Sequence, residues 1–100
     1  MSRTYTDDTD IPTAGTQIQL GAALALTLRK ISSINMRALP TNTGNVVVGD
    51  LNVAIGNGYP LKPGEALDVN YGDGSEVLGY WWGDVATSGD NIAWTAVGKL

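Results

Sequence analysis

The chain has 100 residues, 43% of them hydrophobic and 16% charged, with a net charge of −4 and neither histidine nor cysteine. The lack of cysteine excludes disulfides and cysteine-based zinc sites, and the lack of histidine removes the most common metal ligand and general base. The acidic balance gives no electrostatic footprint for nucleic acid, and no apolar run approaches the roughly 20 residues that span a membrane. We therefore expect one soluble domain that binds neither nucleic acid nor membrane.

Residues 1–13 are polar, rich in Thr and Asp, and cannot form a core face alone. They lack the basic region and apolar stretch of a secretory signal, so we expect synthesis and folding in a host cytoplasm. We interpret the segment as an extended N-terminal arm that docks on a neighbouring subunit, the alternative being a loose tail. The expected division is an arm at 1–13 and a β domain at 14–100.

From residue 16 onward, alternating apolar and polar residues predict short strands separated by turn residues. The turns recur about every 8–15 residues, which favours an antiparallel β-sandwich or jelly roll in a single all-β domain. Ala and Leu at 21–26 would also suit the start of a helix, but alternation favours a strand there. The predicted strands lie near 16–20, 24–28, 34–38, 45–48, 51–55, 66–70, 76–83 and 91–97.

The predicted strand 76–83 is apolar on both faces, with Val77 and Trp81 on one and Leu78, Tyr80 and Trp82 on the other. A domain of this size cannot bury both faces against its own core, so we expect the second face to contact another subunit. The alternative is that a loop of the same chain covers it. The candidate interface residues are Tyr5, Ile11, Leu78, Tyr80 and Trp82.

No catalytic or cofactor-binding motif is recognisable in the sequence. Gly56-Asn57-Gly58 begins like a dinucleotide-binding loop, but position 61 is leucine, and there is no P-loop. Four carboxylates between residues 65 and 76 could bind Ca²⁺, but their spacing is wrong for an EF-hand, so we favour the interpretation as solvated charges. We expect no enzyme activity, no metal and no cofactor. The four carboxylates are Glu65, Asp68, Asp73 and Glu76.

Three tryptophans provide a further candidate surface, because aromatic faces stack well on sugar rings. Trp81, Trp82 and Trp94 could form such a platform. Packing and assembly are the more common use of Trp in a small β domain, so we favour that interpretation.

Short blocks of turns and strands follow one another in a fixed order along residues 33–98. The blocks are Asn42-Thr43-Gly44, Val46-Val47-Val48-Gly49, Gly58-Tyr59-Pro60-Leu61-Lys62-Pro63-Gly64-Glu65 and Val77-Leu78-Gly79-Tyr80. This order resembles small structural proteins of tailed bacteriophages, several of which decorate or cement the outside of the capsid.

The resemblance implies a β-sandwich or jelly roll that acts as a capsid decoration (cement) protein on the outer surface of the virion head. Such a protein binds where subunits of the major capsid protein meet, often as a homotrimer. Binding only to the assembled shell stabilises that shell by mass action, and repetition around it adds avidity. The resemblance leaves open an alternative, a tail or fibre module that binds a host cell-surface glycan.

Overall fold

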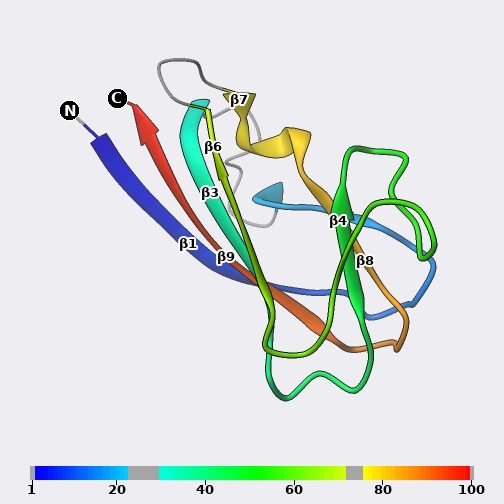
Figure 1. The fold of residues 1–100 in the computed structure, drawn as a ribbon. Helices are drawn as coiled ribbons and strands as arrows, with labels where there is room; N and C mark the ends of the chain where they lie inside the picture. The colour runs from blue at the N-terminus through cyan, green and yellow to red at the C-terminus, as the bar shows by residue number, and fades with distance from the viewer. Residues whose placement is uncertain (1, 23–29, 72–75, 100) are drawn as a thin grey trace.

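The computed structural model describes residues 2–22, 30–71 and 76–99, which form two antiparallel β-sheets packed face to face (Figure 1). The first sheet contains β1 (Ser2–Asp10), β3 (Lys30–Ala38), β6 (Ala66–Asn70), β7 (Glu76–Val77) and β9 (Asn91–Lys99). The second contains β2 (Ile18–Gln19), β4 (Val46–Gly49), β5 (Tyr59–Leu61) and β8 (Trp82–Val85). The 3₁₀ helix η2 (Leu78–Tyr80) connects β7 to β8.

The order of the strands identifies the topology. The first sheet runs β1-β9-β3-β6, with β7 beside the start of β3, and the second runs β2-β8-β4-β5. Strands from the two halves of the chain therefore pair as β1 with β9, β2 with β8, β3 with β6 and β4 with β5. The chain is one long antiparallel hairpin rolled into two sheets, which is the jelly-roll arrangement. The predicted all-β antiparallel sandwich is confirmed.

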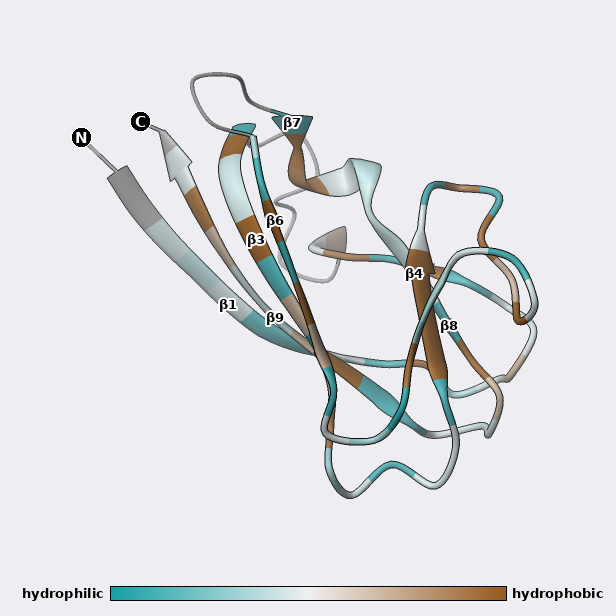
Figure 2. Cartoon of the chain, in the orientation of Figure 1, coloured by the Kyte–Doolittle hydropathy of each residue, from teal (hydrophilic) through white to brown (hydrophobic). Residues whose placement is uncertain are grey.

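The core lies between the sheets and receives apolar side chains from both. Figure 2 shows hydrophobic residues along the strands of each sheet. Gly83 on β8 marks a close approach, because a Cβ there would collide with Cδ1 of Ile92 on β9. Alternate residues along β9 face inward, so the Trp94 side chain is also buried, with 2% of its surface exposed. The largest fully buried side chains are Trp94, Ile11, Leu20, Ile31, Ile34, Met36, Leu61, Leu78 and Ile92.

The N-terminal segment is extended, as expected, but it lies within the sandwich. β1 pairs with β9 over its whole length, from Ser2 opposite Lys99 to Asp10 opposite Asn91. Thr9 faces inward and its hydroxyl accepts a hydrogen bond from Nε1 of Trp94 at 3.2 Å. The predicted boundary at residue 13 therefore does not separate two structural units. Although the side chains of β1 are mostly polar, pairing with β9 gives its backbone N–H and C=O groups hydrogen-bond partners.

Several of the other strand predictions are confirmed. β6 occupies the predicted range 66–70, while β4 and β9 cover most of 45–48 and all of 91–97. β3 begins four residues before the predicted range 34–38, and β2 is a two-residue strand inside 16–20. The predicted strand 24–28 lies outside the described residues.

The predicted strand at 51–55 is wrong, because these residues form a loop over the outer face of the second sheet. The backbone N–H of Val53 donates to the carbonyl of Asp50 at 3.0 Å, which turns the chain after β4. Val53 is buried, and its Cγ2 would lie 3.3 Å from a Cβ at Gly49. Leu51 and Ile55 alternate with Val53 in sequence but stay exposed, so their spacing imitates a strand.

The predicted strand 76–83 is also wrong as one continuous element. It divides into β7, η2 and β8, and the backbone N–H of Trp81 closes the helical turn by donating to the Leu78 carbonyl at 3.1 Å. The turn directs Leu78 into the core, where it is fully buried. The argument from a strand with two apolar faces therefore does not apply to this segment.

A buried carboxylate explains the Asn42-Thr43-Gly44 turn. Asp90 is 7% exposed and accepts hydrogen bonds from the backbone N–H groups of Thr43 at 3.0 Å and Gly44 at 2.9 Å. Beside it, the Asn42 side chain donates to the Asn91 carbonyl at 2.8 Å and accepts from the Asn91 N–H at 2.9 Å. These four contacts fasten the turn before β4 to the start of β9.

Candidate functional site: an exposed apolar surface beside the second sheet

Two of the five predicted interface residues are part of the chain's own core. Ile11 and Leu78 have no exposed surface, so neither side chain can contact a partner in this structure. This corrects their assignment: Ile11 follows β1 and packs in the core, while η2 turns Leu78 inward. Tyr5, Tyr80 and Trp82 retain some exposure.

Tyr80 is the most accessible of the three, with 45% of its surface exposed. Its ring meets the Trp81 ring edge to face, with 5.4 Å between centroids and an interplanar angle of 87°. Nε1 of Trp81 donates to the Tyr71 hydroxyl at 2.8 Å, and Trp81 packs against the core. Burial raises the pKa of the Tyr71 phenol, an effect that this hydrogen bond partly opposes. Trp81 therefore supports Tyr80 and is itself half-buried.

Trp82 projects from the outer face of the second sheet, because its neighbour Gly83 faces the core. On that face it lies opposite Gln19 on β2 and Gly49 on β4. The loop that covers Gly49 brings Val53 close to the same place. Trp82 is therefore next to the segment that leads from β4 to β5.

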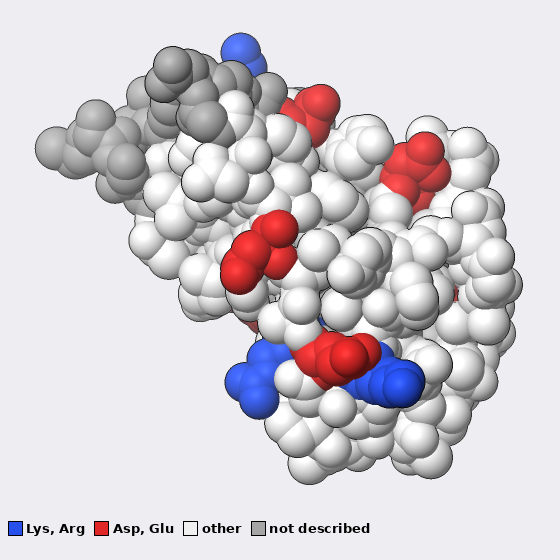
Figure 3. All heavy atoms as spheres, viewed as in Figure 1, with Lys and Arg blue, Asp and Glu red and all other residues white. Residues whose placement is uncertain are grey.

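Among the described residues, most of the large apolar side chains that are exposed belong to this segment or to the start of β5. Leu51 is 61% exposed, Ile55 48% and Tyr59 53%. Nε2 of Gln17 donates to the Leu51 carbonyl at 2.8 Å, which ties the loop to the region before β2. Figure 3 shows an acidic group at the upper right of the molecule and an uncharged surface below it. We call Leu51, Ile55 and Tyr59 together the 51–59 surface. Leu51 and Ile55 belong to the loop over the outer face of the second sheet, whereas Tyr59 lies opposite the core residue Val48 and is exposed at the edge of the inner face.

Sequence reasoning missed the 51–59 surface because it assigned Leu51 and Ile55 to a strand with one buried face. A usable signal was present. Gly49-Asp50 and Asn57-Gly58 are turn pairs, so the residues between them are bracketed by turns on both sides. Apolar residues in such a short loop stay exposed unless the loop folds back onto the sheet, and of these residues only Val53 is buried in that way.

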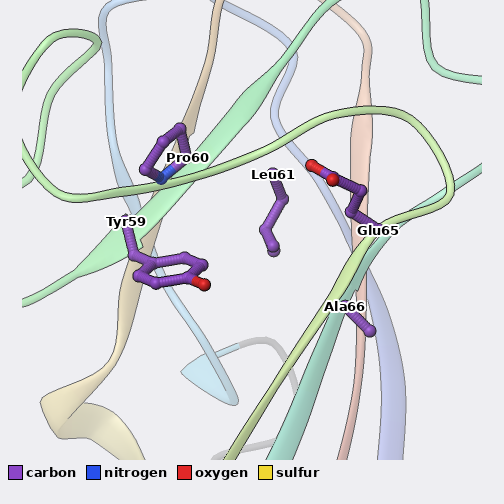
Figure 4. A pocket seen from close by; sticks show the side chains of 5 residues that line it. All are labelled: Tyr59, Pro60, Leu61, Glu65 and Ala66. Carbon is purple, nitrogen blue, oxygen red and sulfur yellow. The ribbon is translucent and has the colours of Figure 1, made fainter.

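An open hollow of about 480 Å³ lies beside Tyr59, between β5 and β6 (Figure 4). The Tyr59 ring and the Glu65 carboxylate stand on opposite sides of Leu61 in this view, and Pro60 and Ala66 complete the lining. Oε1 of Glu65 accepts a hydrogen bond from the Lys62 N–H at 2.7 Å, which fixes the carboxylate. The hollow therefore combines the exposed aromatic ring of Tyr59 with a hydrogen-bond acceptor of fixed orientation, the Glu65 carboxylate.

A second hollow, of about 310 Å³, lies on the outer face of the first sheet, over β9, β3 and β6. Its side chains are small and mostly polar, and across it Asn35 donates to Oδ1 of Asp68 at 2.6 Å. The Asn35 and Asp68 side chains already form a hydrogen bond with each other across the paired strands, so we do not consider this hollow as a binding site.

The acidic residues of the sequence do not assemble into a metal site in the described ranges, where no group of three or more potential ligands is found. Asp68 is hydrogen-bonded to Asn35, and Oε1 of Glu76 accepts from the N–H of Val77 at 2.9 Å. Asp73 lies outside the described residues. Among the described residues there is also no helix with the length and hydrophobicity to cross a membrane.

Of the three tryptophans considered for sugar stacking, Trp94 cannot serve. Only 2% of its surface is exposed, and its indole N–H is engaged by Thr9 inside the sandwich. Trp81 and Trp82 are both partly exposed, but Trp81 is held by Tyr71 and packs on the core, whereas Trp82 projects from the outer face of the second sheet.

Comparison of the chain with protein-family models, with curated proteins and with solved structures found no match.

Proposed function

We propose that this protein is a capsid decoration protein of a tailed bacteriophage, which binds the outer surface of the assembled head and stabilises contacts between major capsid protein subunits. The observation that carries the proposal is the exposure of Leu51 and Ile55 in the loop over the outer face of the second sheet, beside the partly exposed Trp82. Large apolar side chains exposed in one loop of a small domain are typical of protein–protein contacts.

The mechanism we propose is thermodynamic. A protein that binds the assembled shell and not its free subunits lowers the free energy of the shell by an amount that grows with the ratio of its concentration to Kd. Burying Leu51 and Ile55 supplies the contact, and the loop that carries them is held in place by Val53 and the Gln17 hydrogen bond. Many copies on one shell add these contributions.

Shells that lack the protein provide the test. We expect purified protein to bind such shells and to raise the temperature at which they release DNA. The double variant L51K/I55K should weaken binding at least about tenfold, because two exposed apolar contacts become charged. The matched control is Asn52→Lys, which adds charge to the same loop at an exposed polar position and should change binding less than about twofold. Wild-type protein that does not bind these shells would refute the proposal.

A second function, recognition of a host cell-surface glycan by a tail or fibre module, is favoured by the hollow beside Tyr59. An exposed aromatic ring can stack on a sugar, and the Glu65 carboxylate, held by Lys62, can accept hydrogen bonds from its hydroxyls. A glycan array separates the two functions. A decoration protein gives no signal on the array, whereas a glycan-binding module gives one that Tyr59→Ala removes.

A further inference from the structure

Asn57 and Gly58 are an asparagine–glycine pair in the loop between β4 and β5, and both residues are exposed. Such a pair can react within itself, because the backbone nitrogen of the second residue can attack the side-chain amide carbon of the first and close a cyclic imide. The reacting groups are adjacent in the chain, so the attack has the advantage of an intramolecular reaction. It requires a backbone nitrogen that is neither hydrogen-bonded nor shielded by a side chain.

The Gly58 nitrogen meets both requirements. Within the described residues its N–H donates no hydrogen bond, since the pairing of β5 with β4 begins at Tyr59 and no turn contact engages it. The fold also keeps glycine at this position. Its φ is +123°, and a Cβ would lie 2.6 Å from Cγ2 of Val53 and 3.1 Å from the Val48 carbonyl oxygen. The residue that the loop needs here is therefore the one that protects its nitrogen least.

Asn52 is exposed in the same loop and provides an internal comparison. The residue after it, Val53, is buried and donates its N–H to the Asp50 carbonyl at 3.0 Å. The branched Val53 side chain also crowds that nitrogen. At the remaining exposed asparagines of the described chain, the following residue is buried or donates its N–H to another carbonyl. These pairs are Asn45-Val46 and Asn70-Tyr71.

Ammonia and water balance the reaction at Asn57. The bond between the Gly58 nitrogen and Cγ of Asn57 forms, the bond between Cγ and Nδ2 breaks, and ammonia leaves with the proton that the Gly58 nitrogen loses. Water from the solvent then opens the imide at either of its carbonyl groups. Opening at one gives aspartate, and opening at the other gives isoaspartate, in which the main chain continues through Cγ. Nothing is oxidised or reduced.

The isoaspartate product is incompatible with the contacts that shape this loop. Nδ2 of Asn57 donates to the Asn52 carbonyl at 3.2 Å, and a carboxylate cannot donate in its place. The Asn57 carbonyl accepts from the Ala54 N–H at 3.1 Å, and the Asn57 N–H donates to the Ala54 carbonyl at 2.8 Å. In isoaspartate that Asn57 carbonyl leaves the main chain, and an additional carbon enters the chain before Gly58. Because Gly58 is packed closely against Val53, it has little room to absorb the extra length.

We propose that Asn57 is a site of spontaneous deamidation and that its isoaspartate form opens the loop between β4 and β5. Three features carry the proposal together: the exposed asparagine, the unengaged nitrogen that follows it, and a backbone position that only glycine fits. The inference is independent of the proposed function, since it concerns the free chain and no partner.

Peptide mapping by mass spectrometry tests the site after the full chain has been incubated in mildly alkaline buffer. Conversion of amide to acid should be at least about tenfold faster at Asn57 than at Asn52, and should yield both aspartate and isoaspartate. The matched variant Asn57→Gln must close a larger ring, so its conversion should be at least about tenfold slower. The proposal is overturned if Asn57 converts no faster than Asn52, or if aspartate forms without isoaspartate.

Limited proteolysis tests the opening of the loop. Anion exchange isolates the isoaspartate form, and a protease that recognises large apolar residues should cleave it at Leu51 or Ile55 at least about fivefold faster than wild type, because cleavage requires local opening. The control is Asn57→Asp, which has the same charge on a normal backbone and should stay within about twofold of wild type. Far-UV circular dichroism confirms that both forms are folded. Equal cleavage of the isoaspartate form and Asn57→Asp contradicts the opening of the loop.

Discussion

Asp90 is expected to be among the most sensitive polar positions in the chain. Replacement by alanine removes two charge-assisted hydrogen bonds, to the N–H groups of Thr43 and Gly44. Hydrogen bonds to charged groups contribute about 1.5–3 kcal/mol each, so the simple sum is about 3–6 kcal/mol. Thr43 is exposed, and its N–H regains a water partner in the variant. We therefore expect a loss of about 2–4 kcal/mol.

Asparagine at position 90 keeps the shape but not the acceptors. Its oxygen can serve one of the two N–H groups, while its NH₂ faces the other as donor against donor. The expected loss for Asp90→Asn is about 2 kcal/mol, which lowers Tm by about 8–16 °C in a domain of this size. Urea denaturation followed by tryptophan fluorescence measures it, because Trp94 is buried in the core and reports its opening.

Asp50→Asn is the matched control, since it removes the same charge. The Asp50 carboxylate is exposed and accepts from the N–H of Asn52 at 2.9 Å within one loop, so we expect a loss below about 0.5 kcal/mol. If Asp90→Asn and Asp50→Asn cost the same, the carboxylate at 90 does not fasten the turn, and the explanation given for Asn42-Thr43-Gly44 is wrong.

Two further predictions concern packing and charge. Gly83→Ala should destabilise the protein by about 1–3 kcal/mol, because the new Cβ collides with Cδ1 of Ile92, and Ile92→Val, which removes that atom, should recover part of the loss in a denaturation cycle. Asp8→Asn should stabilise the chain by about 0.2–0.5 kcal/mol at neutral pH and low salt, after allowance for solvent screening. The raised pKa of Asp8 means that wild-type stability falls as pH rises from about 3.8 through that pKa, so the gain should vanish in acid; a gain that persists there contradicts this reasoning.

The elements that sequence reasoning located are those with local signals. Residues 66–70 alternate Leu67 and Val69 with polar neighbours and follow the Pro63-Gly64 turn, so pattern and turn together define β6. The same reasoning holds for β9, where Ile92, Trp94 and Ala96 alternate and become core. Alternation over a few residues carries this information by itself.

The elements that were predicted wrongly from the sequence depend on partners that are distant in the chain. β1 carries mostly polar residues, and only β9, at the other end of the chain, makes it a strand. The apolar residues around Gly79 match a strand pattern, yet the helical turn from Leu78 to Trp81 redirects them. The candidate site shifted for the same reason: Ile11 and Leu78 moved into the core, while Leu51 and Ile55 were exposed by a loop that folds over Gly49.

The position of β9 between β1 and β3 has a consequence for how the protein folds. Every pair in the first sheet except β3 with β6 and β7 needs residues 91–99, so that sheet stays open until the last strand has been synthesised. Joining β1 to β9 also closes a loop of almost the whole chain, which makes folding slow relative to helical domains of equal size. The edges of β3 and β6 are exposed during that interval, which makes the nascent chain prone to aggregation until the last strand is inserted.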